Sequence, residues 1–336
     1  MADTVLVTGG TGFLGGWCIV RALERGYDVR TTVRSLSREP DVRAVVAAAG
    51  AEPDGRLTVL EADLTADAGW AEAVAGARYV LHVASPFPPV QPKDPDELIV
   101  PARDGALRVL RAALDAGVER VVMTSSIAAI RSDRTSSETA PYTEADWTDG
   151  NDTRRTPYVR SKTLAEQAAW EHVRSAGAEQ RLAVVNPGAI IGPALSTDHS
   201  YSLQAVQRLV DGDMPAMPRL GFTFVDVRDV ADLHLLAMTL PQAGGERFIA
   251  TDEWRWLPDV AAVVRERLGD AAPKVPTRTA PNLLIRAVAL FDGSIRSVVG
   301  DLGKRTWVSS EKARSTLGWT TLPVEDSIED TARSLI

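Results

Sequence analysis

Cysteine is nearly absent from this chain, because Cys18 is the only one among 336 residues. A single thiol excludes an internal disulfide framework and a cysteine-rich metal site. It also favours a reducing compartment, so we expect a cytoplasmic protein. Only four histidines occur, and none belongs to a His-x-x-x-His pair. We therefore expect no metal centre.

Long hydrophobic runs are also missing. No apolar stretch reaches the roughly 18 residues of a membrane-spanning helix, and Met1-Ala2-Asp3 lacks the basic start of a secretory signal. The net charge of -8 argues against a nucleic-acid partner, which usually needs a basic face. One local basic pocket would still suffice for an anion. We expect a small-molecule partner, no nucleic acid and no membrane, and either a monomer or a homodimer.

Lysine is scarce beside arginine. Of the 37 basic residues, five are Lys and the others are Arg. The remaining composition is ordinary, with 45% hydrophobic and 24% charged residues, as in soluble globular proteins. At about 150 residues per domain, the length suggests two domains or one large domain with an appendage.

Predicted strands and helices alternate along the first part of the chain. This alternation predicts a doubly wound parallel sheet of the Rossmann type, with helices on both faces and a smaller mixed C-terminal lobe. We expect residues 1–190 to form the nucleotide-binding domain, with 222–250 returning to it. Residues 191–221 and 251–336 should form a substrate-binding lobe. The predicted strands are 4–8, 28–33, 57–62, 78–83, 120–124 and 182–186, and the main helices are 13–25, 98–116 and 158–175.

A glycine-rich turn joins the first strand to the first helix. Gly9, Gly12 and Gly15 have the spacing G-x-x-G-x-x-G, which permits a tight turn and close approach of a pyrophosphate. The following helix presents free N–H groups to that anion. We therefore expect Gly9, Gly12, Phe13, Leu14 and Gly15 to bind a dinucleotide.

The end of the second strand indicates which dinucleotide. NAD sites usually place Asp or Glu there to hold the ribose 2′-hydroxyl, whereas this chain has Arg34. The planar guanidinium of Arg suits a 2′-phosphate, so we expect NADP(H), with Arg38 as a candidate second contact. Asp63 and Leu64, just past a later strand, are candidates to hold the adenine.

Three residues together suit carbonyl chemistry. Tyr158 and Lys162 are four residues apart on one predicted helix and so share a face, and Ser126 ends a buried strand. Lys162 should lower the pKa of the Tyr158 phenol and hold the nicotinamide ribose. Ser126 should orient the substrate carbonyl.

These motifs resemble the extended branch of the short-chain dehydrogenase/reductases, and within it the dihydroflavonol, cinnamoyl-CoA and aldehyde (ketone) reductases. The resemblance covers most of the first 240 residues, and its most specific part is the stretch from Tyr158 to Trp170. It implies a catalytic triad of Ser126, Tyr158 and Lys162. It also implies that Tyr158 and Lys162 contact the cofactor, together with Ala84, Ser85, Pro187 and Ile190.

The substrate side departs from the family pattern. Arg131 stands where dihydroflavonol reductases carry an Asn, so a flavonoid substrate is not expected. Candidate substrate residues are Ser85, Phe87, Arg131 and Tyr201.

We therefore expect an NADPH-dependent carbonyl reductase that reduces an aldehyde or ketone, with Tyr158 as the proton donor. One alternative is a nucleotide-sugar epimerase or dehydratase. The other is a non-catalytic NADP-sensing protein.

Overall fold

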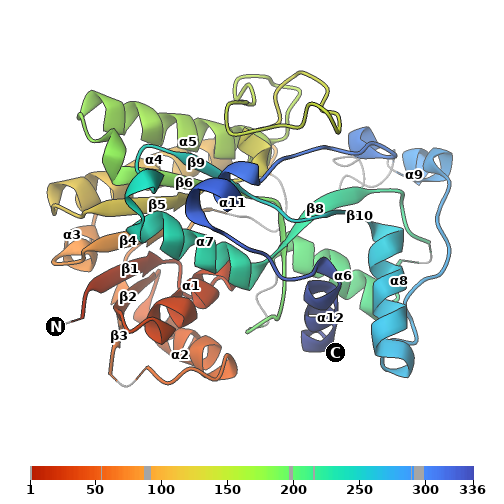
Figure 1. The fold of residues 1–336 in the computed structure, drawn as a ribbon, viewed down its shortest axis with the longest axis horizontal. Helices are drawn as coiled ribbons and strands as arrows, with labels where there is room; N and C mark the ends of the chain where they lie inside the picture. Colours follow the sequence, from red (N-terminus) through yellow and green to blue (C-terminus); the bar gives the residue numbers. More distant parts are fainter. Residues whose placement is uncertain are drawn as a thin grey trace.

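The larger part of the molecule is a parallel sheet with the strand order β3-β2-β1-β4-β5-β6-β9 (Figure 1). The computed structural model describes residues 2–53, 55–86, 92–196, 200–214, 216–288, 290 and 299–336. All neighbouring strands of this sheet run parallel, which confirms the predicted sheet. The strands are β1 (Thr4–Thr8), β2 (Asp28–Val33), β3 (Leu57–Glu61), β4 (Tyr79–His82), β5 (Arg120–Thr124), β6 (Leu182–Pro187) and β9 (Arg247–Ala250).

Helices cover both faces of this sheet, because its central strands are apolar on both sides. Along β1, Val5 and Val7 enter one core cluster and Leu6 enters the other, as the two-residue period of a strand requires. Helices α1 (Phe13–Glu24), α2 (Glu39–Ala48), α7 (Val227–Thr239) and α11 (Glu311–Leu317) pack in the first cluster. Helices α3 (Trp70–Val74), α4 (Asp96–Asp115) and α5 (Pro157–Ser175) pack in the second.

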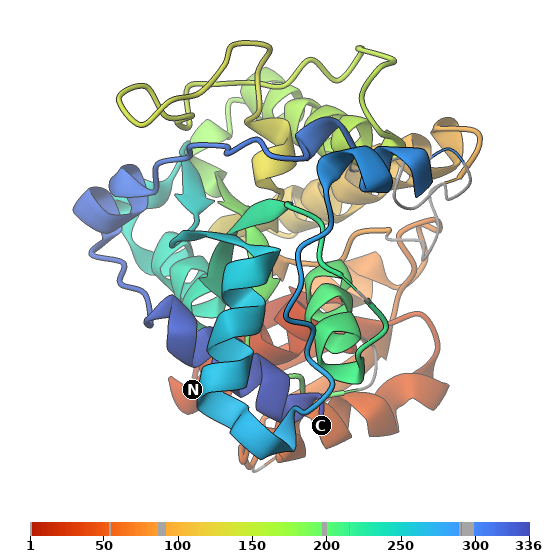
Figure 2. The same ribbon diagram turned by 90° about the vertical axis from the view of Figure 1, so that its right-hand side faces the viewer.

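A smaller mixed sheet of order β10-β8-β7 lies beside the large one. It consists of β7 (Ala189–Ile191), β8 (Gly221–Asp226) and β10 (Trp254–Trp256), with β10 antiparallel to β8. Helices α6 (Tyr201–Asp211), α8 (Leu257–Leu268) and α12 (Val324–Ser334) share an apolar core with it, and Figure 2 shows this part from the front. The chain also contains α9 (Asn282–Val288) and the 3-10 turns η1 (Leu36–Arg38), η2 (Ile127–Ala129), η3 (Glu179–Arg181), η4 (Pro241–Ala243), η5 (Gly269–Ala271) and η6 (Val299–Asp301).

Residues 222–250 are divided between the two sheets. Strand β8 pairs with β7 and β10 in the smaller sheet, whereas α7 packs on the large sheet and β9 pairs with β6. The smaller sheet therefore takes one strand from the segment that we expected to return to the nucleotide-binding part.

The direction of the strand order reverses between β1 and β4. Ligands of open parallel sheets bind outside the carboxyl ends of the strands at such a switch point. The glycine turn follows β1, and residues 83–86 follow β4, so both segments lie where a dinucleotide is expected. No helix within the described ranges is long and apolar enough to cross a membrane.

Candidate active site

The turn after β1 requires glycine for two reasons. Gly9 has a φ of +76°, which residues with side chains rarely adopt. A Cβ on Gly15 would lie 2.2 Å from the carbonyl oxygen of Gly9, so α1 packs directly on the turn. Gly12 precedes α1 and makes no side-chain cap, which leaves the first N–H groups of the helix open to an anion. These features fit a pyrophosphate group.

The turn is held against the end of β4 by one hydroxyl group. The Oγ1 atom of Thr8 accepts a hydrogen bond from the backbone N–H of Ala84 at 3.0 Å and lies 3.0 Å from Nδ1 of His82. Burial lowers the pKa of His82 to about 3, and the nearby Lys162 adds to this effect. His82 is therefore neutral at physiological pH and can accept the Thr8 proton. Ser85, next along the chain, is half-buried.

The two arginines after β2 differ in whether their guanidinium groups are available to bind a phosphate. Arg34 is exposed, and no hydrogen bond or salt bridge joins it to another residue of the described ranges. The side chain of Arg38 instead forms an ion pair with Asp41. The guanidinium of Arg34 is thus free for a phosphate, whereas that of Arg38, our candidate second contact, already has a carboxylate partner.

The loop after β3 holds Asp63 in a defined orientation. One carboxylate oxygen of Asp63 accepts hydrogen bonds from the backbone N–H and the hydroxyl of Thr65, both at 2.7 Å. These bonds lower the pKa of Asp63, and the charge of Arg34 contributes in the same direction. Asp63 is therefore an anionic acceptor beside Leu64, as recognition of an adenine amino group requires.

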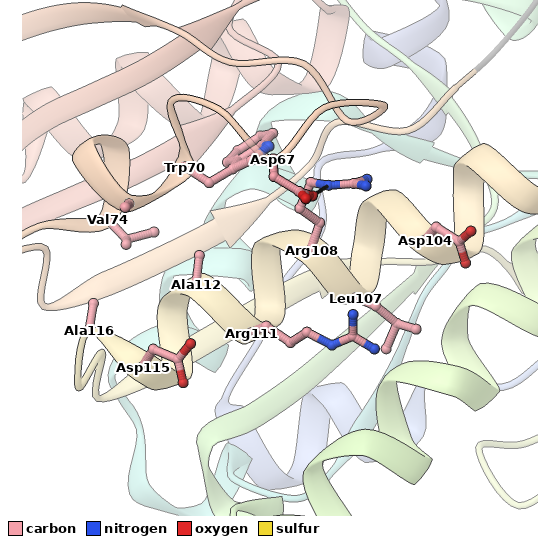
Figure 3. A pocket seen from close by; sticks show the side chains of 11 residues that line it. Asp67, Trp70, Val74, Asp104, Leu107, Arg108, Arg111, Ala112, Asp115 and Ala116 are labelled. Atoms are coloured by element: carbon pink, nitrogen blue, oxygen red, sulfur yellow. Dashed lines mark hydrogen bonds and ion pairs between the residues drawn. The ribbon is translucent and has the colours of Figure 1, made fainter.

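A residue of α4 fastens this loop from behind. The Nη1 atom of Arg108 donates to the backbone carbonyl of Leu64, and its Nε pairs with Asp67. Figure 3 shows Arg108 reaching from α4 to Asp67 across a groove between α3 and α4. Arg111 lies in the same groove. Nothing in the local sequence pattern distinguishes Arg108, so sequence reasoning missed it.

The hydroxyl groups of Ser126 and Tyr158 meet beyond the carboxyl end of β5. Ser126 is buried and begins η2, where its Oγ accepts the backbone N–H of Ala128 at 3.1 Å. Tyr158 lies in the first turn of α5, which Thr156 caps through the N–H of Val159 and in which Pro157 is the first residue. A side-chain hydrogen bond joins Ser126 to Tyr158.

In the protein alone, burial acts against the expected lowering of the Tyr158 pKa. Burial raises the pKa of the Tyr158 phenol, and the hydrogen bond with Ser126 offsets only part of the increase. The reason is that removal of the phenol from water disfavours the charged phenolate more than a single hydrogen bond favours it. Tyr158 is therefore a protonated phenol at neutral pH, which is the form that can donate a proton.

Lys162 lies one helical turn beyond Tyr158 on α5. It is only 8% exposed, and no hydrogen bond joins its ammonium to another residue in the part of the chain that the structure describes. Burial lowers the pKa of Lys162 to about 8, while the negative charge of Glu166 counteracts part of that effect. The ammonium is thus charged at neutral pH and free to bind a ribose hydroxyl.

Glu166 was not identified from the sequence, although its spacing is informative. It follows Lys162 by one turn on a helix face that also contains Ala165 and Ala169, and its side chain is fully buried. A buried carboxylate needs strong partners. Its Oε1 accepts from Nε of Arg247 at 2.6 Å, and its Oε2 accepts from Nδ2 of Asn186 at 2.8 Å.

The two residues expected beside the nicotinamide lie at the end of β6 and in β7. Pro187 is the buried last residue of β6 and pairs with Ala250 of β9. Ile190, in β7, is half-buried and packs against the core of the large sheet. Phe13 is half-buried and Leu14 buried at the start of α1.

The expected substrate residues are only partly described. Phe87 lies outside the described residues, and Tyr201 is described only as the first backbone position of α6. Arg131 forms an ion pair with Asp301 of η6, with Nη2 2.9 Å from Oδ1. Arg131 therefore links the segment after Ser126 to the C-terminal part of the chain. No cluster of three or more metal-binding side chains occurs among the described residues.

Comparison with known proteins identifies relatives over most of the chain. The profile of the NAD dependent epimerase/dehydratase family matches residues 5–250. Cinnamoyl-CoA reductase 1 of Arabidopsis thaliana is 36% identical over 249 residues, which cover 74% of this chain and 70% of the relative. Cinnamoyl-CoA reductase CAD2 of Medicago truncatula is 33% identical, and the aligned region covers 100% of this chain and 96% of the relative.

A solved structure matches over nearly the whole length as well. Gre2 from Candida albicans, determined in complex with NADPH, superposes with a TM-score of 0.80 at 25% identity. The match covers 99% of this chain and 98% of that one. The two-part architecture described above is thus shared with a solved NADPH complex.

Proposed function

The chain belongs to the NAD dependent epimerase/dehydratase family, in its extended short-chain dehydrogenase/reductase branch, and from this membership we propose that it is an NADPH-dependent carbonyl reductase. The observation that carries the proposal is the hydrogen-bonded pair Ser126–Tyr158 with the buried Lys162 one turn away. The relatives named as reductases, and the Gre2 complex with NADPH, support the same chemistry.

The residues around the switch point fit NADPH. The uncapped start of α1 suits the pyrophosphate, the exposed Arg34 suits a 2′-phosphate and Asp63 suits the adenine amino group. When bound, the cofactor supplies the hydride that reduces the carbonyl carbon. The residues that we assign to hold it are Gly9, Gly12, Phe13, Leu14, Gly15, Arg34, Asp63, Leu64, Ala84, Ser85, Tyr158, Lys162, Pro187 and Ile190.

Each member of the triad has a separate role in this proposal. The phenol of Tyr158 donates its proton to the carbonyl oxygen of the substrate, which the raised pKa allows at neutral pH. Ser126 donates a hydrogen bond to the same oxygen and stabilises the negative charge that develops on it. The ammonium of Lys162 holds the nicotinamide ribose and stabilises the phenolate that remains on Tyr158.

The smaller part of the molecule supplies the substrate side in this proposal. Its first strand, β7, begins shortly after β6 ends at Pro187 and contains Ile190. Helix α6 is the next helix along the chain. We assign Ser85, Phe87, Arg131 and Tyr201 to this side, with an aldehyde or ketone as the substrate. Because Arg131 is paired with Asp301, it does not present a free cation there, and we expect a neutral substrate.

Two features favour reduction over the epimerase and dehydratase chemistry of the family name. The residue after β2 is Arg34, whereas a tightly held NAD would favour an acid at this position. Ser126 is followed by Ile127, Ala128 and Ala129, so no acidic pair follows the serine. The intact Tyr158 and Lys162 also argue against a protein that only senses NADP.

A cofactor oxidation screen tests the proposal. Purified protein is mixed with NADPH and a panel of aldehydes, β-ketoesters, diketones, flavonoid-type ketones and cinnamoyl-CoA, and loss of the reduced nicotinamide is followed. Parallel reactions contain NADH. We expect turnover of at least one aldehyde or ketone, with a preference for NADPH. Tight NADPH binding without any turnover would instead support the sensor alternative.

A further inference from the structure

A buried ion pair lies directly behind the Ser126–Tyr158–Lys162 triad. Glu166 of α5 is fully buried and Arg247 of β9 is 7% exposed. Besides Glu166, Arg247 binds the backbone carbonyls of Glu144 and Asp146 at 2.8 and 2.9 Å and stacks on the ring of Trp147. Arg247 is therefore fixed on several sides, and its position determines where Oε1 of Glu166 lies.

The second carboxylate oxygen of Glu166 reaches the segment after β5 that contains Ser126. Oε2 accepts from the hydroxyl of Ser125 and from Nδ2 of Asn186. The same Asn186 amide group donates to the backbone carbonyl of Ser126 at 3.2 Å. One carboxylate thus ties α5, which contains Tyr158, to the segment between β5 and η2, which contains Ser126.

The charge of Glu166 also acts on Lys162, which lies one turn earlier on the same helix. The charged and titratable groups that act on Lys162 are Glu166 on α5 and His82 on β4. His82 is neutral at physiological pH, because burial lowers its pKa to about 3. Glu166 is therefore the anionic group that opposes the loss of charge from Lys162.

We propose that Glu166 is a positioning residue of the active site: its buried carboxylate holds Ser126 in register with Tyr158 and supports the ammonium of Lys162. The role rests on the proposed reductase function. Glu166 touches no substrate in this scheme, and it acts through Lys162, Ser125 and Asn186. Arg247 compensates the charge of this carboxylate through the ion pair.

The proposed effect of Glu166 on the charge of Lys162 can be tested without an activity assay. The chain has five Lys residues, so selective isotopic labelling of lysine yields few NMR signals, and a Lys162→Arg sample identifies the one of interest. In the cofactor-free protein we expect Glu166→Gln to move the titration of Lys162 to lower pH. Glu171→Gln, an exposed position on the same helix, should leave it unchanged.

The positional part is tested by kinetics with a substrate from the screen. We expect Glu166→Gln to lower kcat by about 10- to 100-fold, as a small misplacement of catalytic groups does, with little change in KM for NADPH. The fall of activity at high pH should begin at lower pH than in the wild type. Ser125→Ala should reduce kcat while leaving the titration of Lys162 in place.

A second variant provides the same test if Glu166→Gln alone does not fold. Glu166→Gln combined with Arg247→Met removes both members of the buried ion pair, so that neither is left without the other, and the Lys162 titration should still move to lower pH. An unchanged titration in either folded variant, together with a wild-type kcat, would overturn the proposed role of Glu166. A chain with no reductase activity overturns the proposed function alone, because the NMR titration is read without cofactor or substrate.

Discussion

The hydroxyl of Ser126, which caps η2 just after β5, is hydrogen bonded to the hydroxyl of Tyr158, in the first turn of α5. The two residues come from different elements, and in the proposed reaction both hydroxyls act on the carbonyl oxygen of the substrate. Because burial keeps the Tyr158 phenol protonated at neutral pH, this pair is suited to reduction, in which the oxygen must gain a proton.

We expect Tyr158→Phe to lower kcat by about 10²- to 10⁴-fold, the usual contribution of a general acid. Binding of NADPH, measured by fluorescence titration, should persist because the ring is retained. Tyr27→Phe is the matched control, since Tyr27 is half-buried against Tyr79 and remote in the fold. Wild-type turnover by Tyr158→Phe would exclude the phenol as the proton donor.

Replacement of Arg34 by Ala should weaken the binding of NADPH but not that of NADH. Loss of hydrogen bonds to a charged phosphate costs about 1.5–3 kcal/mol, so KM for NADPH should rise about 10- to 100-fold. KM for NADH should change little. Arg38→Ala should have a smaller effect, because that guanidinium pairs with Asp41. Equal rates with the two cofactors in the wild type would contradict the assignment of Arg34.

Arg108→Ala should loosen the attachment to α4 of the loop after β3, which contains Asp63 and Leu64. We expect KM for NADPH to rise by about ten-fold, the scale of one charge-assisted hydrogen bond, while kcat stays close to that of the wild type. Arg111→Ala, in the same groove (Figure 3), should change neither constant. A selective fall in kcat for Arg108→Ala would count against a role in cofactor binding.

Asp229 should make the stability of the protein dependent on pH. Burial raises its pKa to about 7, although the backbone N–H of Leu322 donates to its carboxylate at 2.8 Å. The folded state therefore holds a proton that the unfolded state loses near pH 4. The contribution of this group to stability is present at low pH and is lost as the pH rises toward about 7.

The measurement is thermal unfolding between pH 5 and 8. Asp229→Asn should flatten the decrease in Tm and raise Tm by a few degrees at pH 8, because the amide oxygen can still accept from Leu322. Asp213→Asn, at an exposed position, should leave the profile as in the wild type. An unaltered slope in Asp229→Asn would show that other groups set it.

The sequence by itself determined the features that depend on neighbouring residues along the chain. Alternating apolar runs predicted the parallel sheet, and the three glycines predicted the turn after β1, where Gly9 indeed has a positive φ. The four-residue spacing of Tyr158 and Lys162 placed them on one face of α5. These features follow from the periods of the strand and the helix, which are local properties of the backbone.

Only the tertiary structure decided the pairings between distant residues. It joined Glu166 to Arg247 and paired Arg131 with Asp301. It gave Arg38 the partner Asp41, whereas Arg34 has no ion-pair partner among the described residues. It also raised the pKa of Tyr158 where the local spacing with Lys162 had suggested the opposite. Burial and partner choice depend on which surfaces meet when the elements pack, and no local spacing specifies that.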